Sequence, residues 1–351
     1  MFPRRMRRLI SYTPGEQPQD KKYLKLNTNE NPYPPSPRIK GLLDHFDIER
    51  LRLYPDPMAE RLREKLSQKY GLEKEEVFVS NGSDEALSFC FYAFFDGEKG
   101  NLLFPQISYS FFPVYCSFYG INYETIPLNH DFTIDITKFL EKPGCGVVLS
   151  NPNAPTGIAL PLERLAYLLE NHPSDRVILI DEAYVDFGGE SAAPFIRKYP
   201  NLAVVRTFSK SLSLAGLRLG FVMASEALIS ALFTVKDSFN SYPVDTLTQM
   251  IGEIALSDDA YYQSIIEEII AVREAFTGAL LDLGWNVLPS KANFVFAQKS
   301  GFHGRDLYLS LKRRGILVRH FDGERTKGFI RITIGRREDM ERLITVIKEM
   351  F

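Results

Sequence analysis

The stretch that most constrains the fold runs from Leu202 to Phe221, with the sequence LAVVRTFSKSLSLAGLRLGF. It begins with an apolar run that predicts a buried strand, and the apolar pattern returns at Leu219 to Met223. Between the two apolar segments lie the polar side chains Thr207, Ser209, Lys210 and Arg218. Hydroxyls and a guanidinium suit the binding of a phosphate monoester, and a partly desolvated amine suits Schiff-base chemistry. The alternative is that Lys210 is an ordinary surface lysine in a serine-rich loop.

A second charged group follows another apolar run, Val177 to Ile180. Four consecutive apolar residues are typical of a strand buried on both faces, as in a parallel sheet. Asp181 comes next, at the carboxyl end of the strand, where open α/β sheets bind their ligands. Because a buried carboxylate needs a positive partner, a protonated pyridine nitrogen is one candidate ligand. The alternative is that Asp181 caps the N-terminus of a following helix.

A candidate anion site lies near residue 82. Val77 to Ser80 predicts a short strand, the turn Asn81-Gly82-Ser83-Asp84-Glu85 follows, and Ala86 to Phe95 predicts an apolar helix. The free backbone N–H groups at the start of a helix point at whatever lies there, so this order of elements can bind an anion.

Two arginines are candidates for binding a second anion. Arg331 lies inside the apolar strand predicted for Phe329 to Ile334, where a charge needs a strong reason. A bidentate anion clamp is one reason, and a buried ion pair with Asp or Glu is the alternative. Arg319 is the second candidate, although Val318-Arg319-His320 equally fits the edge of a strand.

Composition excludes several classes of function. A formal net charge of −2 gives no indication of binding to nucleic acid or to a membrane surface. The three cysteines and five histidines show no metal-ligand spacing, so we expect no structural metal and a reducing compartment. The N-terminal MFPRRMRRLISY carries four arginines but lacks the apolar region of a signal peptide, so we expect a cytoplasmic protein. We expect the arginine run to be a solvated arm or a contact with a partner subunit.

The expected elements divide the chain into an N-terminal arm (residues 1–45), a large domain (46–240) and a small C-terminal domain (241–351). Proline, asparagine and turn formers predict little regular structure before Pro37. Apolar strands alternate with helices in the large domain, which predicts an α/β fold. A long helical run at Asp245–Leu283, broken near residues 257–259, is expected to bridge the domains. The small domain is predicted to be α+β, with strands near Val287, Phe294–Ala297, Ile316–Arg319 and Phe329–Ile334 and helices near Gly304–Arg314 and Arg337–Met350.

Several motifs occur in an order and at a spacing that resembles the histidinol-phosphate aminotransferase family. They are TFSK with GLRLG, DEAY, NPNAPTG, RITIG and, near the N-terminus, LNTNENPYP and RLYPD. The resemblance extends from about Tyr12 to the C-terminus. It implies fold-type-I architecture, with a mainly parallel seven-stranded sheet between helices and a smaller α+β domain. It also implies pyridoxal 5′-phosphate as cofactor and amino transfer from L-histidinol phosphate to 2-oxoglutarate, which yields imidazole-acetol phosphate and L-glutamate in histidine biosynthesis.

The resemblance further implies roles for individual residues. Lys210 is expected to bind the cofactor and move the substrate proton, Asp181 to pair with the pyridine nitrogen and Tyr109 to stack on the ring. The cofactor phosphate is expected to contact Gly82, Ser83, Asp84, Thr207, Ser209, Arg218 and, from the neighbouring subunit of a homodimer, Tyr54. The residues expected near the substrate are Tyr12, Asn29, Arg319 and Arg331.

This chain departs from the family pattern at one position. The family usually has asparagine immediately before the second proline of NPNAPTG, where it contacts the 3′-oxygen of the cofactor ring, but this chain has Ala154. Either Tyr184 carries more of that contact, or Asn153 reaches the ring oxygen from its shifted position.

Three other functions fit parts of the same pattern. An aromatic amino acid aminotransferase and an L-threonine-phosphate decarboxylase share the lysine, the aspartate and the phosphate motifs. A pyridoxal-phosphate-binding regulator normally carries an added DNA-binding domain, for which this chain has no spare length. A catalytically dead homologue is expected to lose Lys210 or Asp181, and both are present.

Overall fold

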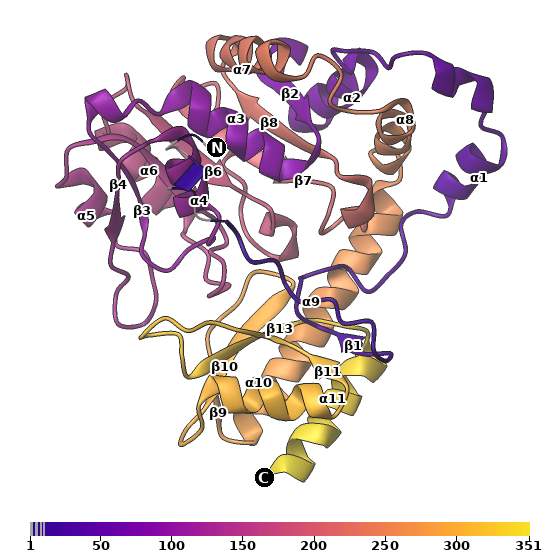
Figure 1. Ribbon diagram of the computed structural model, residues 1–351, viewed down its shortest axis with the longest axis vertical. Coiled ribbons are helices and arrows are strands. Elements are labelled where there is room, and N and C mark those ends of the chain that lie inside the picture. Colours follow the sequence, from indigo (N-terminus) through magenta and orange to yellow (C-terminus); the bar gives the residue numbers. More distant parts are fainter. Residues whose placement is uncertain (1–2, 4–5, 8, 10) are drawn as a thin grey trace.

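Two sheets of unequal size, connected by one long helix, organise the chain (Figure 1). The computed structural model describes residues 3, 6, 7, 9 and 11–351. Three of the four N-terminal arginines, at positions 4, 5 and 8, lie outside the described residues, and so does most of the predicted arginine arm. No helix in the described part of the chain is both long and apolar enough to cross a membrane.

The larger sheet has seven strands in the order β2-β8-β7-β6-β5-β3-β4. Their bounds are β2 (Val77–Ser80), β3 (Asn101–Pro105), β4 (Tyr123–Ile126), β5 (Gly144–Ser150), β6 (Val177–Asp181), β7 (Leu202–Thr207) and β8 (Gly220–Ala224). Strands β3 to β7 are parallel to one another, whereas β8 is antiparallel to both β2 and β7. This topology confirms the predicted α/β fold with a mainly parallel sheet.

Both faces of this sheet are buried because alternate residues of each strand enter different cores. In β6, Ile178 and Ile180 join one cluster, while Val177 and Leu179 join the other. The first cluster receives side chains from α2 (Glu60–Tyr70), α6 (Leu162–Asn171) and α8 (Thr246–Ala255), together with single residues from other helices. The second cluster receives α3 (Gly82–Phe94), α4 (Phe112–Tyr119) and α7 (Glu226–Phe239). The carboxyl ends of the parallel strands therefore meet at one open edge between the helical layers.

The smaller sheet has four antiparallel strands in the order β12-β13-β10-β9. Its strands are β9 (Trp285–Val287), β10 (Phe294–Lys299), β12 (Arg319–His320) and β13 (Phe329–Thr333), and its helices are α10 (Gly304–Arg313) and α11 (Arg337–Met350). The predicted strand at Ile316–Arg319 is divided in two. Its first part, β11 (Ile316–Leu317), pairs with β1 (Leu24–Lys25), and its second part becomes the edge strand β12.

Helix α9 (Asp259–Asp282) connects the two sheets (Figure 1), and the predicted break near residues 257–259 separates it from α8. Helix α8 packs against α1 (Arg38–Asp44) and α2 of the larger unit, although the predicted boundary at residue 240 assigns it to the small domain. The remaining short elements are α5 (Thr137–Leu140) and 3₁₀ turns at Ile48–Arg52, Lys74–Glu76, Gly97–Lys99, Val185–Phe187, Ala193–Phe195 and Ala215–Leu217. The N-terminal segment runs between the two units (Figure 1), and Asn29 in it forms hydrogen bonds with Tyr184 of the larger unit and with Thr333 of the smaller one.

Candidate active site

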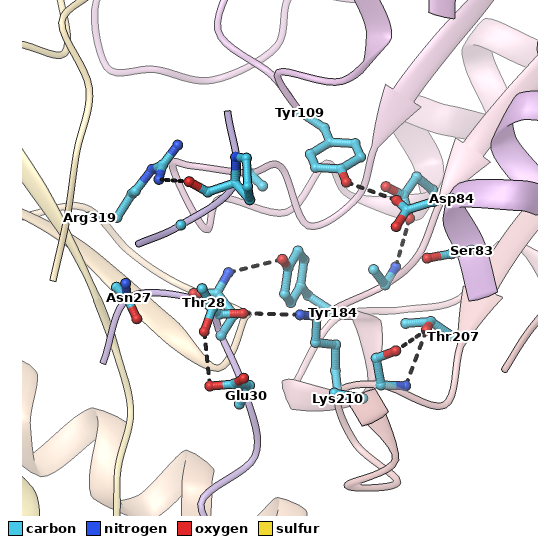
Figure 2. A pocket seen from close by; sticks show the side chains of 18 of the residues that line it. Asn27, Thr28, Glu30, Ser83, Asp84, Tyr109, Tyr184, Thr207, Lys210 and Arg319 are labelled. Carbon is cyan, nitrogen blue, oxygen red and sulfur yellow. Dashed lines mark hydrogen bonds between the residues drawn. The ribbon is translucent and has the colours of Figure 1, made fainter. Parts of the chain in front are cut away.

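A cavity of about 450 Å³ lies at the carboxyl ends of β5, β6 and β7, where the small unit and the N-terminal segment close over the sheet (Figure 2). The predicted site residues that line it are Tyr12, Asn29, Ser83, Asp84, Tyr109, Asp181, Tyr184, Thr207, Ser209, Lys210, Arg218, Arg319 and Arg331. The structure therefore brings together groups that lie far apart in the sequence. Gly82, Asn153 and Tyr54 are not among the residues that line the cavity.

Lys210 lies just after β7 and is partly buried. Its Nζ donates a hydrogen bond to the carbonyl oxygen of Thr28 at 3.3 Å and lies 5.7 Å from the centre of the Tyr184 ring. Lys210 forms no ion pair with any residue that the structure describes. The alternative of an ordinary surface lysine does not fit this position, and an amine held by one carbonyl remains available for chemistry.

Asp181 ends β6 and is only 4% exposed. Burial raises the pKa of its carboxyl group from 3.8 to about 7, although the backbone N–H of Ala183 donates to Oδ1 at 3.1 Å and opposes the rise. No cationic side chain forms an ion pair with Asp181 among the described residues. The bond to Ala183 closes a local turn and caps no helix, so the capping alternative fails. A cationic ligand beside this carboxylate would favour its charged form.

The predicted anion turn has the geometry that the sequence indicates. Helix α3 begins at Gly82 itself, four residues earlier than predicted, and Gly82 has a φ of +82°. Gly220 of β8 lies against the start of this helix, because a Cβ atom there would lie 2.5 Å from the backbone N of Ser83. Only glycine permits this close approach. Ser83 and Asp84 at the start of α3 line the cavity, and the first N–H groups of a helix have no intrahelical partner, so they are available as hydrogen-bond donors.

Hydroxyl and guanidinium groups complete this end of the cavity. The Thr207 hydroxyl donates to Oγ of Ser209 at 3.0 Å and accepts from the Ser209 N–H at 3.1 Å. Arg218 pairs with Asp84 at 3.0 Å, and both side chains remain 45% exposed. Backbone N–H groups, hydroxyls and a guanidinium together form a donor set that fits a phosphate monoester.

Tyr109 and Tyr12 form one wall of the cavity. The Tyr109 hydroxyl donates to Oδ1 of Asp84 at 3.0 Å (Figure 2), and burial raises the pKa of this phenol well above its usual value. Tyr12 packs against Phe111, with ring centres 4.8 Å apart. Both rings are therefore positioned by contacts within the chain, and Tyr109 presents a neutral aromatic surface.

Arg331 of β13 is a partly buried arginine, and no acidic side chain pairs with it among the described residues. Its Nη2 donates to the carbonyl oxygen of Asn27 at 3.1 Å, and its Nε is buried with no hydrogen-bond partner. Its guanidinium carbon lies 5.2 Å from the centre of the Phe294 ring. Burial lowers the pKa of the guanidinium, and Arg319 lowers it further. The alternative of a buried ion pair with Asp or Glu is not found among the described residues, so the guanidinium is free to bind an external anion.

Arg319 and Asn29 also line the cavity, but neighbouring groups occupy their side chains. Arg319 donates to the carbonyl oxygens of Pro14 and Thr13 at 3.2 and 3.0 Å, so it holds the N-terminal segment in place. The amide nitrogen of Asn29 donates to the Tyr184 hydroxyl at 2.9 Å. Neither residue therefore has all of its polar atoms free for a substrate.

Two predicted site residues point elsewhere. Asn153 is 1% exposed, and its amide nitrogen donates to the carbonyl oxygen of Ile107 and to the Thr156 hydroxyl at 3.0 and 3.1 Å. It lines a separate cavity of about 270 Å³, while Ala154 lines the main one. The structure therefore does not support a contact reaching from Asn153. Tyr54 is 81% exposed on the outer surface and stacks on Tyr242, with ring centres 4.6 Å apart.

The sequence prediction missed several residues that shape the site. Thr28 provides the carbonyl that holds Lys210, and the Asn31 amide donates to the backbone carbonyl of Lys210 at 2.9 Å. Behind the lysine, Arg206 pairs with Asp186 and, at 3.7 Å, with Glu182. Arg206 was detectable, because it is a charge inside an apolar strand just as Arg331 is.

Comparisons with known proteins give a consistent result. The chain matches the family described as aminotransferase class I and II over residues 21–347. It is 57% identical to the histidinol-phosphate aminotransferase of Syntrophus aciditrophicus, covering 100% of this chain and 98% of the relative. It is 50% identical to histidinol-phosphate aminotransferase 1 of Bradyrhizobium diazoefficiens, covering 98% of this chain and 97% of that protein.

Solved structures share the fold at lower identity. The histidinol-phosphate aminotransferase of Sinorhizobium meliloti, in complex with pyridoxal 5′-phosphate, superimposes with a TM-score of 0.88 at 22% identity over 100% of this chain and 98% of that one. The L-threonine-O-3-phosphate decarboxylase of Porphyromonas gingivalis gives a TM-score of 0.80 at 23% identity over 93% and 99% of the two chains. Because enzymes with different reactions share this architecture, the likeness of these structures shows the fold alone.

Proposed function

Because this chain belongs to the class I and II aminotransferases, and within them to the histidinol-phosphate aminotransferase family, we propose that it transfers the amino group of L-histidinol phosphate to 2-oxoglutarate with pyridoxal 5′-phosphate as cofactor. The products are imidazole-acetol phosphate and L-glutamate. One observation carries the substrate proposal: Arg331 is a partly buried arginine with no acidic partner among the described residues, and it lines the same cavity as Lys210 and Asp181. A substrate that brings a phosphate or carboxylate group into this cavity provides the missing anion.

The residues present fit the proposed cofactor. When bound, pyridoxal 5′-phosphate supplies an aldehyde that accepts an amine and a pyridinium ring that withdraws electrons. Asp181 lacks a cationic partner, so it suits the ring nitrogen, and Lys210 is the amine that suits the aldehyde. The start of α3, with Thr207, Ser209 and Arg218, suits the phosphate group. Tyr109 forms the wall on which the ring is proposed to stack.

Lys210 is proposed to move the proton of the reaction. Its Nζ would take the proton from the substrate α-carbon as a base and later release that proton as an acid. The Thr28 carbonyl holds Nζ at 3.3 Å and orients it for this transfer. The N-terminal segment at Tyr12, Pro14 and Gly15 forms part of the cavity wall and helps to exclude water.

Arg331 is proposed to bind the anionic end of each substrate in turn. The buried Nε has no hydrogen-bond partner in the part of the chain that the structure describes, so it is available to donate to a phosphate or carboxylate oxygen. Alternate binding of histidinol phosphate and glutamate at one guanidinium agrees with ping-pong kinetics. Arg319 supports the clamp indirectly, because it fastens the segment at Thr13 and Pro14 beside it.

We also propose a homodimer in which Tyr54 reaches the cofactor phosphate of the partner subunit. Several apolar side chains that precede Tyr54 in the sequence are exposed, and so is Phe239, three residues before its stacking partner Tyr242; they are Leu43 (51%), Ile48 (72%), Leu51 (55%), Leu53 (58%) and Phe239 (76%). Gathered apolar side chains of this kind mark protein interfaces. Burial of this surface, which is defined by residues 43–54 and Phe239, would place Tyr54 against a second chain.

Absorbance spectroscopy of the purified protein tests the proposal. Histidinol phosphate is expected to shift the cofactor band toward the pyridoxamine form, and 2-oxoglutarate is expected to reverse the shift. A response to tyrosine or phenylalanine alone assigns the chain to the aromatic enzymes, and release of carbon dioxide from phosphothreonine assigns it to the decarboxylases. Absence of any cofactor band after addition of pyridoxal 5′-phosphate would overturn the whole proposal.

A further inference from the structure

Asn29 in the N-terminal segment forms hydrogen bonds with Tyr184 of the larger unit and with Asn293 and Thr333 of the smaller one. It is 1% exposed and has a φ of +56°, a conformation that asparagine tolerates better than most residues. Its backbone N–H donates to Oγ1 of Thr333 at 3.0 Å, and its carbonyl accepts from the Asn293 amide at 3.0 Å. A buried residue in a left-handed conformation with so many partners is held in one position.

The hydrogen bonds of the side chain fix which way its amide faces. The Thr333 hydroxyl donates to Oδ1 of Asn29 at 3.1 Å, so the amide nitrogen must face the opposite way. That nitrogen donates to the Tyr184 hydroxyl oxygen at 2.9 Å. A reversed amide would place an oxygen against Tyr184 and an NH₂ group against the Thr333 hydroxyl, which already accepts the backbone N–H of Asn29; the hydroxyl would then accept twice, and its own proton would lose its acceptor on Asn29. The order Thr333, Asn29, Tyr184 therefore has a defined direction of donation.

This direction determines what Tyr184 can do. Its oxygen accepts from Asn29, and no acceptor for its own O–H is found among the described residues. Tyr184 lines the main cavity, so the phenol proton is left for an acceptor there. Donation to the phenol oxygen also strengthens the phenol as a donor, since linked hydrogen bonds polarise one another.

We infer that Asn29 is a positioning residue that makes Tyr184 a hydrogen-bond donor to the ring oxygen of the cofactor. This inference rests on the proposed function. Ala154 provides no side-chain donor in the cavity, and Asn153 faces away from it, so Tyr184 is the donor on which the ring oxygen depends. Asn29 acts through Tyr184 and touches no reacting atom.

The inference also links the substrate clamp to the phenol. Thr333 lies two residues after Arg331 on β13, so the two side chains share one face of the strand. Arg331 contacts the carbonyl of Asn27, and Thr333 contacts Asn29, two residues further along the same segment. The same strand therefore contacts both the Arg331-bound residue Asn27 and the residue that orients Tyr184.

A pH titration of the absorbance of the loaded enzyme tests this role. A donor to the ring oxygen stabilises negative charge there, so weakening the donor is expected to raise the apparent pKa of the spectral transition. Asn29→Gly removes the amide while keeping a residue that adopts positive φ freely, and it is expected to raise this pKa by about half a unit to one unit. Tyr184→Phe is expected to raise it at least as much. The double variant Asn29→Gly/Tyr184→Phe is expected to match Tyr184→Phe alone, because Asn29 acts through the phenol.

Asn201→Ala is the matched control, because Asn201 is also a buried asparagine whose amide donates to a backbone carbonyl, that of Arg176, but it does not line the cavity of Lys210. It is expected to leave the spectral pKa unchanged. If Asn29→Gly does not fold, Thr333→Val removes the hydroxyl that directs the amide, and a smaller shift of the same sign is expected. The inference is overturned if the Asn29 or Thr333 variants titrate like the unmodified protein. It is also overturned if Asn29→Gly shifts the spectral pKa further when it is added to Tyr184→Phe. Absence of a cofactor band in the unmodified protein overturns the proposed function instead.

Discussion

The substitution Arg331→Met separates a binding role of this arginine from a structural one. If the guanidinium clamps the substrate anion, the variant loses charge-assisted hydrogen bonds that contribute about 1.5–3 kcal/mol each. Two such bonds correspond to a decrease in kcat/KM of about 10²- to 10⁴-fold, because about 1.4 kcal/mol is a factor of ten in rate. The decrease is expected for both histidinol phosphate and glutamate, since one clamp is proposed to bind both. Steady-state kinetics with each substrate measures it.

The effect of the same substitution on stability is expected to be small. Arg331 forms no ion pair with a described residue, and its chain hydrogen bond to Asn27 contributes about 1 kcal/mol. Methionine keeps a long side chain between the rings of Phe294 and Phe321, where sulfur–aromatic contact is favourable. We therefore expect the free energy of unfolding to change by no more than about 1 kcal/mol. Breaking a buried ion pair would instead remove about 3–5 kcal/mol.

Arg325→Met provides the matched control. The Arg325 guanidinium donates to the carbonyls of Leu128, Asn129 and His130 and lies 4.6 Å from the centre of the Phe132 ring, outside the main cavity. Its loss is expected to lower the free energy of unfolding by about 1–3 kcal/mol and to leave kcat/KM within about twofold. Urea unfolding compares the two variants. The reasoning is refuted if Arg331→Met unfolds several kcal/mol more easily while keeping most of its kcat/KM.

Three further predictions follow from the geometry of the cavity and the surface. Gly220→Ala places a Cβ atom 2.5 Å from the backbone N of Ser83. In a titration of the apoenzyme, its affinity for the cofactor is therefore expected to fall at least about tenfold. Gly216→Ala is the control, because a Cβ atom there meets no atom within 4 Å, and it is expected to leave the affinity unchanged. The pKa of Asp181 is raised from 3.8 to about 7, so its protonation stabilises the apoenzyme fully below about pH 4, and this stabilisation, up to about 4 kcal/mol, is lost as the pH rises through about 7. Asp181→Asn is expected to lack that part of the pH dependence in thermal unfolding of the apoenzyme, and an unchanged profile would argue against a buried, unpartnered carboxylate. Leu51→Asp introduces a charge into the exposed apolar surface and is expected to give monomers in sedimentation experiments; a native dimer would exclude this surface as the interface.

The sequence was sufficient to predict those residues whose chemistry conflicts with their surroundings. Lys210 and Asp181 follow apolar strands, and Arg331 lies within one, so each is a charge at a position where burial is expected. The structure brings all three to one cavity. The parallel sheet explains why Lys210 and Asp181 meet, because strands that run in one direction deliver the residues at their carboxyl ends to the same edge. Arg331 comes from the separate four-stranded sheet and lies within its strand β13.

The parts of the site that the sequence did not determine depend on backbone groups, on local loop geometry or on a second chain. Thr28 holds Lys210 with a carbonyl group, which every residue type possesses. Asn153 and Ala154 lie in a loop with prolines on both sides, where side-chain directions do not follow the alternation of a strand. Tyr54 is exposed in one chain, and its proposed role depends on a second chain that a single sequence does not describe.

The N-terminal segment determines how the two halves of the site are spaced. Asp181 and Lys210 are placed by strands of the seven-stranded sheet, whereas Arg331 is placed by the four-stranded sheet. Between them, successive residues of one segment contact each side: the carbonyl of Asn27 accepts from Arg331, and the carbonyl of Thr28 accepts from Lys210. Consecutive Cα atoms lie about 3.8 Å apart. These two contacts therefore attach the proposed Arg331 clamp and the Lys210 amine to neighbouring residues of the same segment. Neither sheet alone sets that spacing, so changes in the segment are expected to alter catalysis even where they touch no substrate.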